Sequence, residues 1–295
     1  MIRETWASAR YDFAMRLLAA DPVYVGEWQS QRDVTGANTT YEILNASFQM
    51  PMPDFPSEAA RVTGANLPWA EDHFRERVSG KPLNPPPSNA WWPFNVNGNA
   101  LHKADEKFSH TYPERYWPKF ANIEGETDKG RQIFVPHIGT RFEYGDLGDV
   151  IELLKRSPYS RQAYLPVWFP EDTGSASGQR VPCTLGYQFI IREGAAGKRL
   201  HVIYHMRSCD FMRHLADDIY MTIRLAQWVR DQLQGSVEDQ RFAGMTLGTL
   251  YFSAGSLHIF EPDRVALGGI VRTMATEYSQ RLSRYASGSD VPSDE

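Results

Sequence analysis

The sequence predicts an α/β or α+β protein in which helices flank a mixed β-sheet. Strand-like apolar runs, such as 185–192 and 200–206, are interspersed with helix-like segments such as 211–229, and this mixture is typical of a sheet with helical layers. The 295 residues are 42% hydrophobic and 23% charged, which permits a substantial core. We expect a single domain over 1–286 and a mobile polar tail over 287–295.

The N-terminal part of the chain contains three predicted elements. A helix is expected over 5–20, because Trp6 and Phe13 fall on one apolar helical face. A strand is expected over 41–48 and a short helix over 69–77.

Between residues 80 and 99 the composition shifts to Pro, Asn and Trp, within a predicted insertion near 80–130. A loop of that length is usually either functional or disordered, and the paired Trp91 and Trp92 argue against disorder. Two interpretations stay open for this segment. It is either a lid or cofactor wall, or it is ordinary loop packing.

The C-terminal half alternates between helices and strands. The predicted elements are a helix over 145–155, strands over 162–168, 185–192 and 200–206, a strand pair or bent strand over 250–260, and a C-terminal helix over 264–285.

The charge balance argues against a general nucleic-acid-binding protein. The formal net charge is −5, so no basic stripe is available to displace counterions from a phosphate backbone. A small anionic ligand needs only a few local arginines and remains compatible with this balance. The N-terminus shows no signal-type apolar core, and no apolar run approaches the roughly eighteen residues of a membrane span. We therefore expect a cytoplasmic protein.

The two cysteines, Cys183 and Cys209, have no pairing pattern and are expected to be free thiols in a reducing compartment. Cys183 follows a proline at the start of a predicted strand, where a side chain can face a cleft. Cys209 lies just before a helix for which Asp210 is the expected N-cap. Either thiol could be a buried small hydrophobe, but Cys183 is the better candidate nucleophile, since nearby arginines would favour its thiolate.

Two aspartates lie early on the helix that is expected to begin near Phe211. Asp217 lies off the apolar stripe and is expected to pair with Arg213, one turn earlier. Asp218 borders the stripe, so its carboxyl group must find a partner or stay protonated. It is either a structural hydrogen-bonding group or a polar group aimed into a pocket.

Arg207 and Ser208 are expected at a strand-to-helix turn, beside the free N–H groups of the helix start, which is a favourable place for a phosphate. His201 and His205 are four residues apart on a predicted strand. Because no adjacent cysteine or carboxylate completes a ligand pattern, we expect no metal site there.

Four segments carry a family resemblance: Pro182-Cys183, Tyr187-Gln188-Phe189, Arg207-Ser208-Cys209-Asp210 and 255–260. In order and approximate spacing they resemble the signature segments of thymidylate synthases. The resemblance covers about 32–263 and implies the mixed sheet of that family, with Cys183 as the nucleophile towards a pyrimidine nucleotide.

The resemblance also implies a set of binding residues. The implied substrate-binding residues are Arg32, Arg161, Arg207, Ser208, Asp218 and His258. Arg161 resembles the family segment that reaches across a homodimer to the partner's phosphate. The implied co-substrate is 5,10-methylenetetrahydrofolate, with Asp210 at the pterin and with Trp91 and Trp92 as its candidate aromatic wall.

A catalytic acid is implied as well. Glu71 resembles the family's catalytic glutamate, which organises water and proton transfers, and Glu76 is a rival for that role. No metal is implied.

Residues that differ from those usual in thymidylate synthases indicate a substrate base other than uracil. Asp218 stands where thymidylate synthases have an asparagine, and a carboxyl group suits the N4 amino group and N3 of cytosine better than the O4 and N3–H of uracil. The chain therefore resembles the hydroxymethylase branch of the family, which includes phage deoxycytidylate hydroxymethylases and the cytidylate hydroxymethylase of antibiotic biosynthesis.

We expect CMP as the substrate, with dCMP also accepted, and 5-hydroxymethyl-CMP and tetrahydrofolate as products. Phe260 stands where the family usually has tyrosine, so the sugar preference stays open. Gln162 stands where the family often has a second arginine, so a weaker phosphate clamp is expected. The alternatives are a thymidylate synthase proper acting on dUMP, and a non-catalytic nucleotide-binding regulatory dimer.

Overall fold

A six-stranded mixed sheet forms the centre of the computed structural model, which describes residues 5–26, 38–94, 103–104, 107–120, 123–126, 132–134, 145–173, 181–235 and 240–286. In sheet order the strands are β1 (Pro22–Tyr24), β2 (Thr39–Pro51), β10 (Thr246–Phe260), β9 (Gly197–Asp210), β8 (Thr184–Gly194) and β7 (Tyr164–Pro166). Neighbouring strands are antiparallel except for β9 and β10, which are parallel. This sheet confirms the predicted fold class.

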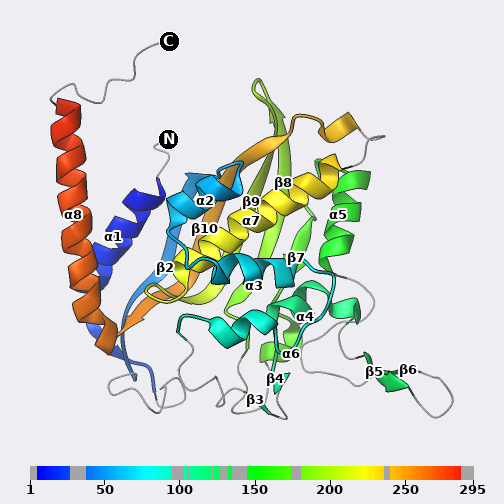
Figure 1. Cartoon of the computed structure of the whole chain (residues 1–295), viewed down its shortest axis with the longest axis horizontal. Coiled ribbons are helices and arrows are strands. Elements are labelled where there is room, and N and C mark those ends of the chain that lie inside the picture. The colour runs from blue at the N-terminus through cyan, green and yellow to red at the C-terminus, as the bar shows by residue number, and fades with distance from the viewer. Residues whose placement is uncertain are drawn as a thin grey trace.

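Helices cover one face of the sheet, as Figure 1 shows. The long helix α7 packs on β9 and β10, with α2 and α3 against it, and α1 packs on β2 beside α8. The helices are α1 (Trp6–Ala19), α2 (Pro56–Thr63), α3 (Trp69–Arg77), α4 (Tyr112–Tyr116), α5 (Leu147–Arg156), α6 (Pro170–Thr173), α7 (Leu215–Gln234) and α8 (Arg264–Ala286). None of the helices that the structure describes is both long and apolar enough to cross a membrane.

Shorter elements complete the described chain. They are the 3-10 turns η2 (Pro87–Trp91), η4 (Pro118–Phe120), η5 (Gln240–Phe242) and η6 (Glu261–Asp263), and the two-stranded ribbons β3 (Lys103–Ala104) with β4 (Lys107–Phe108) and β5 (Ile123–Glu126) with β6 (Gln132–Phe134).

A row of aromatic rings crosses the helix-covered face of the sheet. Phe48, Phe252, Tyr204 and Tyr187 come from four successive strands and are cross-strand partners. Their ring centroids are 5.2, 5.7 and 4.7 Å apart along the row, and Tyr116 of α4 continues it at 6.0 Å from Tyr187. Cross-strand aromatic pairs stabilise a sheet and disfavour slipped registers. The row therefore helps to hold β2, β10, β9 and β8 in one alignment.

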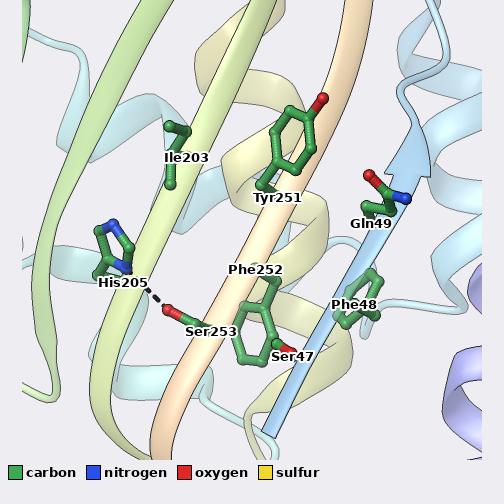
Figure 2. Close-up of a pocket in the computed structure, with 8 residues that line it drawn as sticks. All are labelled: Ser47, Phe48, Gln49, Ile203, His205, Tyr251, Phe252 and Ser253. Carbon is green, nitrogen blue, oxygen red and sulfur yellow. Dashed lines mark hydrogen bonds between the residues drawn. The ribbon is translucent and has the colours of Figure 1, made fainter. Parts of the chain in front are cut away.

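The opposite face of the same strands carries a shallow pocket (Figure 2), with α7 behind the sheet in that view. Its lining residues are Ser47, Gln49, Ile203, His205, Tyr251 and Ser253, together with Phe48 and Phe252, whose rings belong to the aromatic row on the helix-covered face. His205 Nδ1 and Ser253 Oγ are hydrogen-bonded at 2.7 Å, and Tyr251 is 40% exposed. We refer to this surface as the open face of the sheet.

An ion pair stabilises part of the predicted insertion. Arg115 of α4 donates from Nη1 and Nη2 to the two carboxylate oxygens of Asp172 in α6, at 3.0 and 2.9 Å, and both side chains are only 1% exposed. A bidentate contact of this kind has the geometry that a buried charge pair needs. It connects α4 to the segment that follows β7.

The helix start after β9 differs from the prediction. α7 begins at Leu215, with His214 as its N-cap, rather than near Phe211. Asp210 ends β9, and its Oδ1 accepts hydrogen bonds from the backbone N–H groups of Met212 and Arg213, at 2.9 and 3.0 Å. Asp210 therefore stabilises the turn before the helix, and the N-cap prediction was wrong.

Two other predictions are resolved by the described chain. Residues 250–260 belong to one long strand, β10, rather than to a strand pair. Arg207 and Ser208 lie inside β9 and not at a helix start, so their predicted position beside the free N–H groups of a helix was wrong. Arg32 and the tail 287–295 lie outside the described residues.

Candidate active site

A cavity is bordered by α3, α7 and the adjoining ends of β8 and β9. Its volume is about 240 Å³. Since a dry cavity of about 150 Å³ admits benzene, there is room for a heteroaromatic ring. Polar groups in its lining include His73, Arg77, Tyr112, Cys183, Ser208, Asp210 and Asp218, and Trp69 and Trp92 contribute aromatic surface.

Cys183 is partly exposed and lies directly before β8. Nη2 of Arg207 and Oγ of Ser208 both donate to its sulfur, each at 3.8 Å. A thiolate is a better acceptor than a thiol, and it is the nucleophilic form. The two donors therefore suit a sulfur that carries negative charge during a reaction.

The backbone holds the Arg207 guanidinium against Cys183. Nε donates to the carbonyl oxygen of Pro182 at 2.9 Å and Nη2 to that of Val181 at 3.1 Å. Behind Arg207, β10 passes so close that a Cβ on Gly255 would lie 2.8 Å from the Arg207 carbonyl oxygen. Only glycine permits this approach of the two strands.

Cys209 is a poorer nucleophile than Cys183. It borders the same cavity but is only 2% exposed and belongs to the hydrophobic core. Burial raises the pKa of its thiol well above the usual value, and the nearby Asp218 and Asp210 add to the rise. Its neutral form is therefore strongly favoured.

Asp218 lies in the first turn of α7 and lines the cavity. Its side chain is almost fully buried, at 8% relative exposure, and its carboxyl oxygens accept no hydrogen bond from another residue in the described parts of the chain. Burial raises the pKa of Asp218 to about 7, Arg77 opposes the rise, and Asp217 adds to it. Near neutral pH both the acid and the carboxylate are therefore accessible.

Arg77 places a positive charge in the wall of the cavity. It is 3% exposed, and its guanidinium lies 4.0 Å from the ring centroid of Tyr112. Within the described ranges its Nε has no hydrogen-bond partner. The hydroxyl group of Tyr112 shares a 3.1 Å hydrogen bond with Thr184 Oγ1, which connects this wall to the start of β8.

The predicted Asp217–Arg213 pair does not form. Asp217 accepts from the backbone N and the side-chain Nδ2 of Asn66, at 2.7 and 2.9 Å, and Arg213 donates to Asp263 at 2.9 Å. The partner of Asp217 is therefore a residue distant in sequence that helical spacing could not indicate.

Glu71 faces away from the cavity. Its carboxylate accepts from Tyr220 at 2.8 Å and from Arg224 at 2.8 and 3.0 Å. Burial alone would raise the pKa of Glu71, but hydrogen bonds from Arg224 and Tyr220 lower it. Glu71 therefore braces α3 against α7 and is not among the residues that line the cavity, so this position does not support its predicted role as the catalytic glutamate.

Glu76 is not a lining residue either. Its Oε1 accepts from the backbone N of Ser88 at 2.7 Å, and its Oε2 lies 3.4 Å from His73 Nδ1. His73 of the same helix does line the cavity, and Glu76 and Ser88 both contact its ring.

The two predicted cofactor-wall tryptophans are placed differently. Trp92 lines the cavity and stacks on His214, with ring centroids 5.3 Å apart. Within the described chain, its buried Nε1 has no hydrogen-bond partner. Trp91 is 48% exposed and does not line the cavity. The segment 80–99 thus contributes Trp92 to the cavity wall, and Trp91 is not part of that wall.

Of the remaining predicted site residues, the structure describes His258 and Arg161, and neither lines the cavity. His258 of β10 pairs with Asp210 of β9 in the sheet but is not among the lining residues. Arg161 is exposed before β7, where its carbonyl oxygen accepts from Gln188 Nε2 at 2.7 Å. Arg32 lies outside the described residues.

The sequence analysis missed His73, Arg77 and Tyr112. A signal for the first two exists, because Trp69, His73 and Arg77 are spaced four apart on α3 and share one helical face. Glu71 lies on the opposite face of that helix. Tyr112 carries no such local signal, since only the packing of α4 brings it to the cavity.

Comparisons with known proteins identify the family of this chain. A family model described as "Thymidylate synthase" matches residues 102–264, which is more than half of the chain. The chain is also similar to a Methanosarcina barkeri protein named "Putative thymidylate synthase", with 28% identity over 123 residues, which cover 42% of this chain and 49% of that relative. The chain thus spans about half the length of this curated relative. Helix α3 precedes the residues that the family model matches.

The raised pKa of Asp218 predicts a pH-dependent stability difference between the wild-type protein and Asp218→Asn. Between the ordinary pKa of 3.8 and the folded-state pKa of about 7, the folded protein keeps a proton that the unfolded chain has released. The free energy of unfolding of the wild type should therefore fall relative to Asp218→Asn by roughly 1.4 kcal/mol per pH unit, and level off above pH 7. Urea denaturation of both proteins between pH 5 and 8 measures the difference, and parallel curves would contradict it.

Proposed function

This chain belongs to the thymidylate synthase family, and we propose that within the family it is a cytidylate hydroxymethylase. It would transfer a one-carbon unit from methylenetetrahydrofolate to C5 of CMP, and also of dCMP, and add water to give the 5-hydroxymethyl nucleotide and tetrahydrofolate. The observation that carries this proposal is the shared cavity. It places the Cys183 sulfur, with Arg207 and Ser208 at 3.8 Å, in the same lining as the buried carboxyl group of Asp218.

Cys183 supplies the nucleophile in this scheme. Its thiolate adds to C6 of the pyrimidine, and the electrons of the C5–C6 double bond then make C5 nucleophilic towards the one-carbon unit. Arg207 and Ser208 donate to the sulfur, so they stabilise the thiolate before the addition and again when it is released. The partly exposed position of Cys183 leaves the sulfur accessible to a base in the cavity.

In this scheme Asp218 distinguishes cytosine from uracil. As a carboxylate it accepts from the N4 amino group of cytosine but has nothing to donate to O4 of uracil. As an acid it donates to N3 of cytosine and makes C6 more electrophilic. An unpaired buried polar group costs about 1–3 kcal/mol, which corresponds to roughly a tenfold to hundredfold preference.

The residues present fit a folate at one wall of the cavity. Trp69 and Trp92 offer flat aromatic surface, and the buried Nε1 of Trp92 lacks a partner within the described chain, so it can donate to a polar atom of a bound pterin. We propose that Trp92 and Asp210 hold the pterin. When bound, the folate supplies the one-carbon unit.

The open face of the sheet supports a homodimer. Ile203 and Tyr251 contribute apolar surface there, and none of the residues that line its pocket is an aspartate, glutamate, lysine or arginine (Figure 2). A two-fold interface brings the same patch of both copies together, so an uncharged patch avoids like-charge repulsion. We propose that a second copy covers this face and that Arg161 reaches the partner's nucleotide phosphate.

Product analysis tests the proposed reaction. With CMP or dCMP and methylenetetrahydrofolate, we expect mass spectrometry to show the 5-hydroxymethyl nucleotide, together with release of tritium from C5. Cys183→Ala should abolish tritium release, because no thiolate can add to C6, whereas Cys209→Ala should largely keep it. Dihydrofolate formed with dUMP would instead identify a thymidylate synthase. A CMP-induced rise in melting temperature without tritium release would identify a non-catalytic binder.

Asp218→Asn tests the choice of base. The amide pairs with uracil as well as a carboxyl group pairs with cytosine, so the ratio of kcat/KM for dCMP over dUMP should fall by about tenfold to a hundredfold. The relevant measurement is tritium release from C5-labelled nucleotides. An unchanged ratio would remove Asp218 from base recognition.

Mixed dimers test the role of Arg161. Cys183→Ala and Arg161→Ala should each be nearly inactive alone. If Arg161 acts across the interface, re-equilibrating an equal mixture should restore about a quarter of the wild-type activity, because half of the dimers then contain one intact site of two. A catalytically competent monomer in analytical ultracentrifugation, or a mixture without recovery, would contradict this arrangement.

A further inference from the structure

His73 is the titratable side chain that α3 presents to the cavity. Trp69, His73 and Arg77 occupy the cavity face of this helix, four residues apart. Glu71 lies on the opposite face, where Arg224 binds its carboxylate. Neither glutamate of this helix is a lining residue, so the group on α3 that can meet a bound substrate as a base is an imidazole.

The surroundings of His73 hold its ring in one orientation. The ring stacks on Trp69, with centroids 5.2 Å apart and an interplanar angle of 15°. Its Nδ1 lies 2.9 Å from Ser88 Oγ and 3.4 Å from Glu76 Oε2. Trp69 Nε1 is in turn bound to the Ser88 carbonyl oxygen at 3.1 Å, which ties the stack to η2.

The same contacts determine which nitrogen carries the proton. Ser88 Oγ donates to Glu76 Oε2 at 2.5 Å, so it accepts from Nδ1–H of His73. Both of the ring's hydrogen bonds to the described chain use Nδ1, which leaves the lone pair on Nε2 for the cavity. Burial lowers the pKa of His73 to about 4, with a further lowering by Arg77 and an opposing contribution from Glu76. The imidazole is therefore neutral at neutral pH.

Resting on the proposed function, we propose that His73 is the base that takes a proton from the water that adds to the one-carbon unit on the nucleotide. In this step an O–H bond of water breaks, and the proton moves to Nε2. The oxygen forms a bond to the exocyclic methylene carbon at C5. The displaced electron pair passes through the ring and expels the Cys183 thiolate from C6. No group is oxidised or reduced.

Tyr112, Asp218 and Glu76 fit this step less well than His73. The hydroxyl group of Tyr112 is bonded to Thr184, and burial raises the pKa of Tyr112, with Asp218 and Cys183 adding to the rise, so it holds its proton. Asp218 is engaged by the base edge of the nucleotide in the proposed complex. Glu76 sits behind the His73 ring, where its carboxylate can stabilise the imidazolium that forms.

His73→Asn and His73→Gln test the proposal. Asparagine can keep the hydrogen bond to Ser88 while it removes the nitrogen that faces the cavity, and glutamine places an amide near Nε2 that cannot accept the proton. Tritium release from C5 reports the steps before water addition, and hydroxymethyl-CMP reports the completed reaction. We expect the ratio of product to tritium released in the first turnover to fall by about 100-fold or more in both variants, the range of general base catalysis. Intact-mass analysis should then show nucleotide attached to Cys183.

Two further variants serve as controls. Glu71→Gln, a change of similar size on the other face of α3, should keep the wild-type ratio. Glu76→Gln keeps the His73 ring but removes the carboxylate behind it, and its ratio should lie between those of the wild type and His73→Asn. If the His73 variants unfold, the Glu76→Gln ratio decides the question, because a wild-type ratio there overturns the proposal.

The outcomes separate this inference from the proposed function. A wild-type protein that makes no hydroxymethyl nucleotide overturns both. If the wild type makes product, a folded His73→Asn with an unchanged ratio overturns the role of His73 alone. A parallel fall in tritium release and product also overturns it, because a merely structural change slows every step together.

Discussion

The pairing register of β8 and β9 is the constraint on which the cavity chemistry depends. Pairing of Thr184 with Met206, and the 2.8 Å bond from the Arg207 backbone N to the Cys183 carbonyl oxygen, bring the sulfur beside a guanidinium that follows it by 24 residues in sequence. A slip of one residue would turn each side chain to the other face of the sheet. The stacked rings of Tyr187 and Tyr204, on the core side of the sheet, disfavour such a slip. The register of β8 and β9 therefore determines both the packing of the core and the position of the Cys183 sulfur.

Helices α3 and α7 place charged groups in the buried wall of the cavity, where neighbouring charges change their pKa values. Asp218 and Arg77 both line the cavity and are almost fully buried, so each influences the protonation of the other. Burying charged groups is costly when they remain only partly paired, and an apolar wall would be more stable. Their presence is consistent with a ligand that completes the pairing, and the base edge of a pyrimidine presents the complementary donors and acceptors.

The two helices divide the proposed chemistry between two sides of the cavity. A carboxyl group from α7 would select the base, and an imidazole from α3, oriented by Ser88 and Glu76, would act on water. Glu71 binds Arg224 and Tyr220 and so fixes the distance between these helices from the outside. The same contacts that exclude Glu71 from the cavity therefore help to position the groups that line it.

The sequence by itself determined most of the long strands and helices, the free state of the two cysteines and the placement of Cys183 at a strand start. These features follow from local periodicity and from residues adjacent in the chain. It also indicated that Asp218 borders the buried, apolar face of its helix. It did not determine the partner of Asp217, which is Asn66, the outward orientation of Glu71, the position of Asp210 at the end of β9, or the cavity position of His73. Each of these depends on which distant segment packs against a given helix face. Only the tertiary structure decides that, since the hydrogen bonds and burial that stabilise such a choice come from residues far apart in sequence.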